Sequence, residues 1–109
     1  MLFRSTAVGF SVLKGEDTLS PQIENWLKEF SVTQKNWELK TQFHFGGYAK
    51  TTPSLLAFIT EMQLQHNLPL DSVYTGKMFA GIFELISKEY FFSGSRILAI
   101  HTGGLPLLD

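Results

Sequence analysis

The sequence contains no cysteine among its 109 residues. That absence excludes a disulfide scaffold, a thiolate nucleophile and a thiolate zinc site. Basic and acidic residues nearly balance at a net charge of −1, so the sequence also lacks the concentrated basic face that nucleic-acid binding requires. It has no apolar run long enough to span a membrane and no signal-peptide pattern at its start. These absences predict a cytoplasmic chain without nucleic-acid or membrane partners.

Apolar side chains, by contrast, are plentiful: they make up 44% of the residues, and ten of them are Phe. A chain of this length and apolarity can fold around one modest core. We therefore treat residues 1–109 as a single domain. No internal repeat or low-complexity stretch divides it.

Three stretches have the apolar or alternating pattern of strands. They are residues 6–13, 37–45 and 97–100, the last of which has the character of a strand covered on both faces. Residues 70–74 fit either a fourth, short strand or an extended entry to a helix.

Three further stretches have helical periodicity. One opens at Ser20-Pro21 and one at Thr52-Pro53, each with a capping residue followed by proline, and the third covers residues 76–89. Strands and helices thus alternate, which predicts an α/β fold with a parallel sheet and helices packed on it.

Three segments that follow predicted strands combine glycine with a hydroxyl-bearing residue. They are Gly46-Gly47-Tyr48, Tyr74-Thr75-Gly76 and His101-Thr102-Gly103-Gly104. In open α/β sheets, ligands bind outside the carboxyl ends of the strands. Glycine lets a backbone approach a ligand, and a hydroxyl can donate or accept a hydrogen bond. The simpler alternative is that each glycine only makes a turn.

Lys77, at the start of the third helix, has two interpretations. It could be a Schiff-base lysine or a phosphate contact, or it could be a solvent-facing or salt-bridged lysine. We favour a structural or electrostatic role. His44, His66 and His101 share no metal-ligand spacing, so we expect no metal site.

Two motifs, in this order, resemble the end of the aminocyclopropane-carboxylate deaminase and D-cysteine desulfhydrase family. The first motif consists of two segments, Phe43-His44-Phe45-Gly46-Gly47-Tyr48-Ala49-Lys50 and Leu70-Asp71-Ser72-Val73-Tyr74-Thr75-Gly76-Lys77. The second motif is His101-Thr102-Gly103-Gly104. The opening Val8-Gly9-Phe10-Ser11-Val12-Leu13 resembles the strand after the family's phosphate loop. The resemblance covers nearly the whole chain.

The resemblance implies a tryptophan-synthase-β-like fold, a three-layer parallel sheet with flanking helices, of which this chain is the C-terminal part. It also implies pyridoxal 5′-phosphate, held by a Schiff-base lysine in the N-terminal half and by a glycine-rich phosphate loop. Neither element has a counterpart here, and Lys77 does not match that lysine. Family members are several times longer, so we expect a fragment that alone binds no cofactor and is inactive.

The resemblance carries specific roles to two tyrosines and two threonines. Tyr48 matches a tyrosine on the substrate side of the cofactor, and Tyr74 matches a second active-site tyrosine, so both are candidate catalytic residues. Thr75 stands where the deaminases carry a glutamate, and a threonine cannot supply a negative charge beside the pyridine nitrogen. Thr102 matches a residue whose hydroxyl can face that nitrogen.

The glycines of the last motif leave room for the pyridine ring. The cofactor contacts expected from the resemblance are thus Thr75, Thr102, Gly103 and Gly104.

Two hypotheses of different classes follow. In the first, the chain belongs to a deaminase or lyase that acts on a small amino acid; Thr75 favours the desulfhydrase branch, with α,β-elimination from a small D-amino acid to ammonia and pyruvate. In the alternative, it is a stand-alone, non-catalytic α/β domain that dimerises or binds a partner. Removing the rest of the fold would expose apolar surface and sheet edges, so we expect a homo-oligomer.

Overall fold

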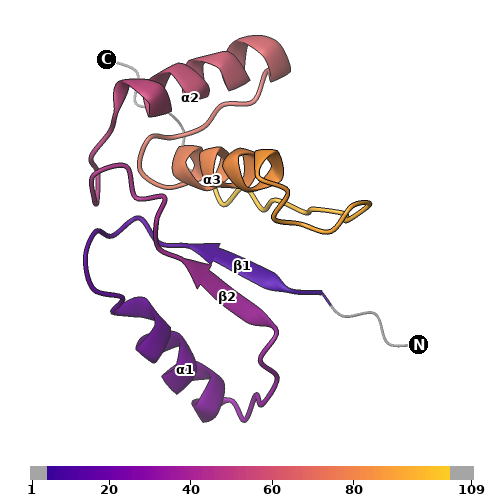
Figure 1. Ribbon diagram of the computed structural model, residues 1–109. Coiled ribbons are helices and arrows are strands. Elements are labelled where there is room, and N and C mark those ends of the chain that lie inside the picture. Colours follow the sequence, from indigo (N-terminus) through magenta and orange to yellow (C-terminus); the bar gives the residue numbers. More distant parts are fainter. Residues whose placement is uncertain (1–4, 104–109) are drawn as a thin grey trace.

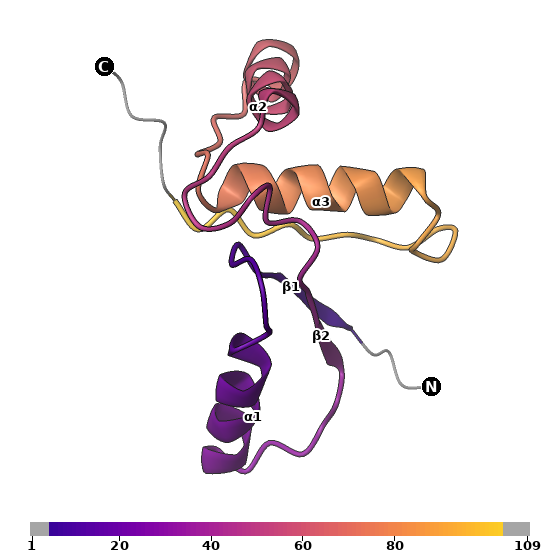
Figure 2. The ribbon, with the colours of Figure 1, turned by 60° about the vertical axis from the view of Figure 1, so that its left-hand side comes forward.

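The computed structural model describes residues 5–103 and shows an α/β arrangement of two strands and three helices. In chain order the elements are β1 (Ala7–Phe10), α1 (Leu19–Glu29), β2 (Trp37–Lys40), α2 (Pro53–His66) and α3 (Thr75–Ser87). The strands form a small parallel sheet, with α1 on one side of it and α2 and α3 on the other (Figures 1 and 2). The α/β class predicted from the sequence is therefore confirmed.

The two strands and α1 form a βαβ unit, because a parallel pair needs a crossover connection. The register pairs Ala7 with Trp37 and Phe10 with Lys40. One more backbone bond, from the amide of Ser11 to the carbonyl of Lys40 at 2.8 Å, continues the contact beyond β1. The first strand is thus real but shorter than the predicted 6–13.

The second strand ends at Lys40 and not at Phe45, which corrects the prediction for residues 37–45. The amide of Thr41 donates to its neighbour's side chain, Gln42 Oε1, at 3.1 Å and leaves the ladder. Phe45 takes a φ of +52°, in the left-handed region that strands do not use. The apolar alternation continues past the strand although the backbone does not stay extended there. The reason is side-chain packing, because the ring of Phe43 lies against the ring of Phe10.

The start of α1 also differs from the prediction, which placed Ser20 at the cap and Pro21 at the first helical position. The helix begins at Leu19, and Asp17 accepts hydrogen bonds from the amides of Leu19 and Ser20, both at 3.0 Å. The first amides of a helix have no partner within it, so an acceptor just before the helix satisfies them. Pro21 still lies in the first turn, where a missing N–H costs little.

The limits of α2 agree with the predicted caps. Thr52 Oγ1 accepts from the amide of Leu55 at 3.1 Å, and Pro53 is the first helical residue. Asn67 closes the helix in the left-handed conformation, with a φ of +50°. Across the described stretch, no helix has both the length and the apolar character that crossing a membrane demands.

Residues 72–74 form a turn and residues 70 and 71 belong to no strand, so the predicted short strand is wrong and an extended entry does not continue to residue 74. The side chain of Asp71 bonds to the amides of Val73 and Tyr74 and bends the chain into α3. The helix itself lies within two residues of the predicted 76–89.

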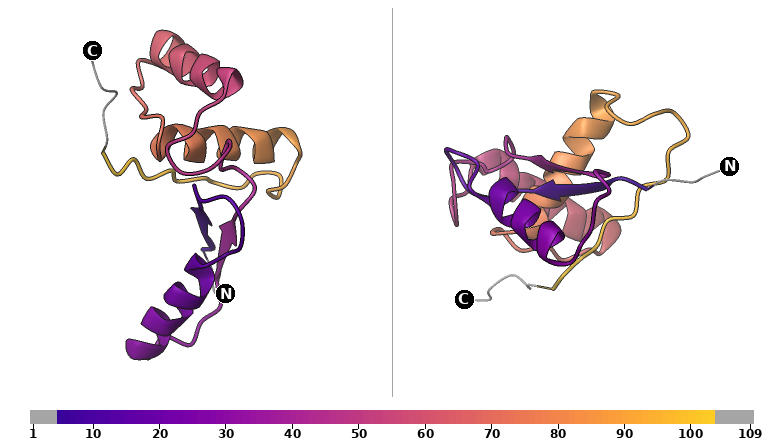
Figure 3. Two further views of the ribbon diagram at one scale, coloured as in Figure 1. Left: turned by 90° about the vertical axis from the view of Figure 1, so that its left-hand side faces the viewer. Right: turned by 90° about the horizontal axis from the view of Figure 1, so that it is seen from below.

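The core lies where α3 packs between α2 and the sheet (Figure 3). Its buried apolar members are Val12, Leu55, Met62, Leu70, Ile82 and Leu85. At Gly81, α3 approaches β1 so closely that an added Cβ would lie 2.6 Å from Cε1 of Phe10. On the α2 side, Phe83 packs edge-on against Phe58, with ring centres 5.3 Å apart.

The apolar run at 97–100 is not a buried strand, which corrects a further prediction. It is an extended segment without strand pairing that runs back along α3 (Figures 1 and 2), and Leu98 is 88% exposed. A strand covered on both faces needs apolar layers above and below it. The described residues supply no such cover over Leu98.

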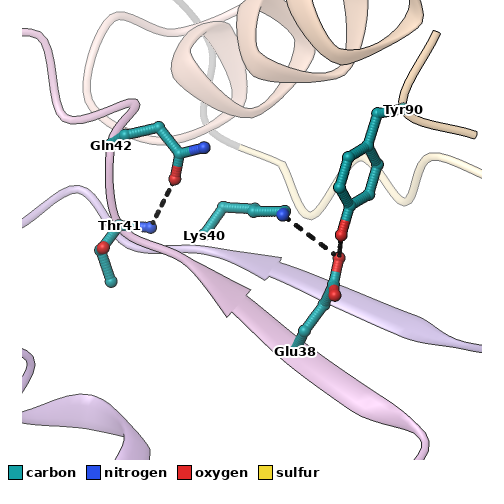
Figure 4. A network of polar contacts seen from close by, with 5 residues as sticks. All are labelled: Glu38, Lys40, Thr41, Gln42 and Tyr90. Atoms are coloured by element: carbon teal, nitrogen blue, oxygen red, sulfur yellow. Dashed lines mark hydrogen bonds and ion pairs between the residues drawn. The ribbon is translucent and has the colours of Figure 1, made fainter.

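A polar network ties the end of α3 to β2 (Figure 4). The hydroxyl of Tyr90 donates to Glu38 Oε1, which also lies 3.5 Å from Lys40 Nζ. The same ammonium lies 3.9 Å from the centre of the Tyr90 ring, a cation–π contact. The turn after α3 is thereby fixed to the sheet.

Candidate functional site

Two tyrosines from separate segments meet through their hydroxyls. Tyr48 lies in the loop after β2, and Tyr74 directly precedes α3. The hydroxyl of Tyr74 donates to that of Tyr48 at 3.3 Å, with the rings edge-on and 6.1 Å apart. This bond, followed by burial, raises the pKa of Tyr74 because it favours the protonated phenol. Both tyrosines are more than half exposed, Tyr48 by 56% and Tyr74 by 53%.

The loop that carries Tyr48 has an unusual backbone. Phe45, Gly46 and Gly47 take φ angles of +52°, +104° and +122°, and Ala49 takes +59°. Glycine adopts such angles freely, whereas other residues do so at a cost in conformational energy. The loop therefore needs contacts from outside to hold its shape.

Lys77 supplies one of these contacts. It is 0% exposed, which corrects the solvent-facing alternative, and its Nζ donates to the carbonyl of Gly47 at 2.8 Å. Burial lowers the pKa of Lys77, since desolvation disfavours the ammonium. The lysine thus joins α3 to the loop that carries Tyr48, in keeping with the structural role favoured from the sequence.

Asp71 organises the start of α3, and the sequence reasoning missed it. Its Oδ1 accepts from the amides of Val73 (2.8 Å) and Tyr74 (2.6 Å), and its Oδ2 accepts from the amide (3.1 Å) and the hydroxyl (2.5 Å) of Thr75. Burial opposes ionisation, but these bonds, led by the Thr75 hydroxyl, hold the pKa of Asp71 below its ordinary value. An acidic residue just before an apolar helix is the signal that could have identified it.

Thr75 is buried, and two of the three bonding positions of its hydroxyl are occupied. The hydroxyl donates to the carboxylate of Asp71 and accepts from the amide of the same residue at 3.0 Å. One lone pair remains. Contact between Thr75 and a cofactor stays a prediction, and it would fall to this lone pair or to the methyl group.

A shallow hollow of about 140 Å³ lies between the end of β1, the start of α3 and the C-terminal segment. Its lining residues are Val8, Gly9, Phe10, Val12, Tyr74, Thr75, Met78, Ile100 and Thr102. Two of the three glycine-and-hydroxyl segments therefore contribute to one hollow. The third reaches it through the bond between Tyr48 and Tyr74.

His101 fixes the segment that brings Thr102 to the hollow. Its Nδ1 accepts from the amide of Gly103 at 3.1 Å, and its Nε2 lies 2.9 Å from the carbonyl oxygen of Pro69. Because Nδ1 accepts, Nε2 carries the proton and donates to Pro69. Gly103 takes a φ of +100° with open space around it, and the predicted Gly104 contact lies outside the described residues.

The hollow fits one side of the pyridoxal ring, the cofactor group that the family resemblance implies. A pyridine ring has apolar faces and a polar nitrogen at its edge; the hollow offers apolar walls and the exposed hydroxyl of Thr102. Complete ligand pockets measure roughly 300–1,000 Å³, so this is part of a pocket. Its lining residues include no lysine or arginine that could neutralise a phosphate. The fit is therefore to the ring-nitrogen side alone.

The other two histidines are His44 and His66. His44 Nδ1 accepts from the amide of Gly46 at 3.0 Å, and His66 lies in the last turn of α2. Within residues 5–103, no three His, Asp or Glu side chains gather as metal ligands.

Several proteins similar to this chain carry the name of the same enzyme. No protein-family model matches the chain. It is 36% identical over 105 residues to a Pyrococcus furiosus protein named "Putative 1-aminocyclopropane-1-carboxylate deaminase". The aligned region covers 91% of this chain and 31% of that relative. A Pyrococcus horikoshii protein of the same name is 31% identical, with 90% and 31% covered. A 1-aminocyclopropane-1-carboxylate deaminase of Cyberlindnera saturnus is 32% identical over 75 residues, or 69% of this chain and 22% of the relative.

The chain thus spans about a third of the length of its archaeal relatives. The similarity extends over most of this chain, in agreement with the resemblance of the motifs around Tyr48, Tyr74 and Thr102. The chain therefore belongs to the 1-aminocyclopropane-1-carboxylate deaminase family.

Proposed function

We propose that the chain supplies the pyridine-nitrogen and substrate side of the pocket of a pyridoxal-phosphate-dependent deaminase or lyase acting on a small amino acid. One observation carries the proposal: the hydroxyls of Tyr48 and Tyr74 pair at 3.3 Å beside a hollow that Thr75 and Thr102 share. The names of the relatives supply the reaction class. The two thirds of their length that this chain does not match would supply the Schiff-base lysine and the phosphate loop.

In such a parent the chain is the C-terminal part of a tryptophan-synthase-β-like, three-layer fold. The order of its strands and helices and the parallel pairing of β1 with β2 support this placement. The exposed run at 97–100 supports it too. Its apolar side chains suit a strand of a larger sheet that the remaining layers would cover.

The described residues have distinct parts in this proposal. Pyridoxal phosphate, when bound, supplies an electron sink for breaking bonds next to the substrate's α-carbon. Thr102 offers its hydroxyl to the ring nitrogen. Tyr74 donates its one hydroxyl proton to Tyr48, and its raised pKa favours keeping that proton, so toward the substrate its oxygen can only accept. Tyr48 accepts from Tyr74 and has its own proton free, so it would donate to the substrate and recover a proton from Tyr74.

The desulfhydrase branch is the finer part of the proposal. The position where deaminases carry a glutamate is Thr75, which brings no charge, and the nearby carboxylate of Asp71 is already bonded to backbone amides. A weaker electron sink suits elimination of a good leaving group better than opening of a ring. For D-cysteine and water, the products would be pyruvate, ammonia and sulfide.

A segment exchange tests the proposal. The matching third of the Pyrococcus furiosus relative is replaced by this chain, and ammonia release is measured from D-cysteine and from 1-aminocyclopropane-1-carboxylate. We expect release from D-cysteine, a large loss in Tyr74→Phe, and none of that loss in the control Tyr90→Phe, whose ring lies on β2. An exchange protein that folds and binds cofactor but releases ammonia from neither substrate would reject the proposal.

A second candidate, self-association without catalysis, rests on exposed apolar surface. Trp26 of α1 is 59% exposed and Phe30, which directly follows the helix, is 74% exposed, and α1 has no buried residue. The total accessible surface of 8534 Å² exceeds the roughly 6,100 Å² expected for a compact monomer of this mass. Light scattering over a concentration series decides the matter: we expect dimers or larger species, and a clean monomer at high concentration contradicts this candidate.

A further inference from the structure

Two donors converge on one backbone carbonyl directly before Tyr48. The oxygen of Gly47 accepts from Lys77 Nζ at 2.8 Å and from the amide of Lys50 at 3.0 Å. A carbonyl oxygen has two lone pairs, so its bonding capacity is filled. Gly47 is itself buried, although it belongs to a loop whose next residue is exposed.

The buried ammonium is a costly feature that needs a reason. Lys77 has no exposed surface, and in the described part of the chain no carboxylate lies within ion-pair distance of its Nζ. A buried charge without a counter-charge disfavours the folded state. The hydrogen bond to Gly47 offsets part of that cost, and it connects α3 to a segment 30 residues earlier in the chain.

The loop that receives this bond would not hold its shape alone. Phe45 and Ala49 have positive φ angles although neither is glycine, and Gly46 and Gly47 between them do as well. Such a backbone persists only where surrounding contacts fix it. Lys77 and Tyr74 belong to the start of the same helix, so the bond to Gly47 also fixes Tyr48 relative to Tyr74.

We propose that Lys77 is a positioning residue: through the carbonyl of Gly47 it holds Tyr48 within hydrogen-bond reach of Tyr74. This positioning role rests on the proposed function, because the two tyrosines are catalytic only if that function is right. Lys77 neither touches the substrate nor carries the cofactor. Its effect is measured at the Tyr74 hydroxyl.

The test is a double-mutant comparison on this chain with ¹³C-labelled tyrosine, in which NMR follows the titration of each ring. Tyr48→Phe removes the bond to Tyr74 directly, and Lys77→Met removes the tether while keeping an unbranched side chain of similar length. Lys88→Met is the matched control, because Lys88 follows the end of α3 with an exposed side chain.

We expect Lys77→Met to lower the pKa of Tyr74 to the value found in Tyr48→Phe, and the double variant to lower it no further. Lys88→Met should leave the pKa of Tyr74 unchanged. A Tyr74 titration in folded Lys77→Met that coincides with that of the unmodified chain overturns the inference.

Should Lys77→Met fail to fold, two measurements on the unmodified chain replace it. A scalar coupling across the hydrogen bond from Lys77 ¹⁵Nζ to the Gly47 carbonyl carbon, together with an Overhauser effect between the two tyrosine rings, supports the inference. The absence of either overturns it. Neither readout uses cofactor or turnover. An exchange protein without ammonia release, combined with a shifted Tyr74, would reject the proposed function and leave the positioning role standing.

Discussion

The hydroxyl of Thr75 donates to the carboxylate of Asp71 and also accepts from the Asp71 amide, at 3.0 Å. The start of α3 is therefore built as a helix cap, with a carboxylate that collects backbone amides. The family resemblance implied that Thr75 contacts the cofactor, yet most of the bonding capacity of its hydroxyl is already used. Thr102 is left as the hydroxyl that can face a pyridine nitrogen.

Replacing Asp71 by Asn should flatten the acid limb of the stability profile. The folded-state pKa of Asp71 lies below its ordinary value of 3.8, so in acid the unfolded state binds more protons. The stabilisation is fully present above the unfolded pKa and is lost as the pH falls through the folded pKa. An asparagine can accept through only one side-chain oxygen, so we expect Asp71→Asn to lose about 1–3 kcal/mol of unfolding free energy at pH 6, and the loss to shrink as the pH falls.

Urea unfolding between pH 2 and pH 7 measures this difference. The control is Asp17→Asn at the exposed cap of α1, which should show a smaller effect. Identical pH slopes for Asp71→Asn and the unmodified chain would contradict the assignment of Asp71 as an ionised cap.

Two glycines of α3 should respond differently to alanine. Alanine favours a helix over glycine by about 1 kcal/mol, so any net loss reports a clash. A Cβ at Gly76 would lie 2.4 Å from the carbonyl oxygen of Asp71, which is backbone and cannot turn away. At Gly81 the nearest atoms, 2.6 Å and 2.9 Å away, belong to the side chain of Phe10. We expect Gly76→Ala to destabilise by about 1–3 kcal/mol or more and Gly81→Ala by less. The reverse order in thermal unfolding would show that the packing around α3 is wrong.

Two leucines, one in the buried core and one in the exposed C-terminal run, should respond differently to replacement by alanine. Leu55 is 0% exposed, so Leu55→Ala should cost about 2–5 kcal/mol of unfolding free energy. Leu98→Ala should change it by less than about 0.5 kcal/mol, as expected for surface positions. Urea unfolding compares them under one condition. A large loss in Leu98→Ala would mean that the run at 97–100 is buried, as its sequence suggested.

Lys77 should resist labelling by pyridoxal phosphate. The cofactor aldehyde reacts with accessible neutral amines, and the Lys77 amine has no exposed surface. After incubation, borohydride reduction and peptide mapping, we expect label on exposed lysines such as Lys88 and none on Lys77. Stoichiometric label at Lys77 alone would make it a covalent residue and contradict its structural role.

The parts of the fold that were predicted correctly are those that depend on residues close together in the sequence. Thr52 and Pro53 mark the start of α2, and Asn67 marks its end, because capping bonds involve residues only a few positions apart. The predicted strand at 97–100 failed for the opposite reason: its apolar side chains report a cover that the described chain does not provide. The apolar character of Phe43 likewise agrees with its packing against Phe10, but it did not indicate that the strand before it ends at Lys40.

The same distinction applies to the candidate site: its local motifs were predicted, and the bonds that bring them together were not. Glycine next to a hydroxyl residue after predicted strands pointed to the segments of Tyr48, Tyr74 and Thr102. The bonds that place them are long-range or involve unremarkable residues: Lys77 reaches Gly47, and His101 reaches Pro69. Periodicity describes one element at a time, so it could not show that a lysine on α3 turns inward to a distant carbonyl.

The central claim, that this chain forms the ring-nitrogen side of a pyridoxal-phosphate pocket, is tested most directly at Thr102. The exchange protein is loaded with cofactor ¹⁵N-labelled at the pyridine nitrogen, and its ¹⁵N resonance is recorded with Thr102→Val and with the control Thr33→Val, which lies outside the hollow. If the Thr102 hydroxyl faces the pyridine nitrogen, the resonance shifts in Thr102→Val and stays in place in Thr33→Val. A pyridine nitrogen that does not respond to the loss of the Thr102 hydroxyl would contradict it.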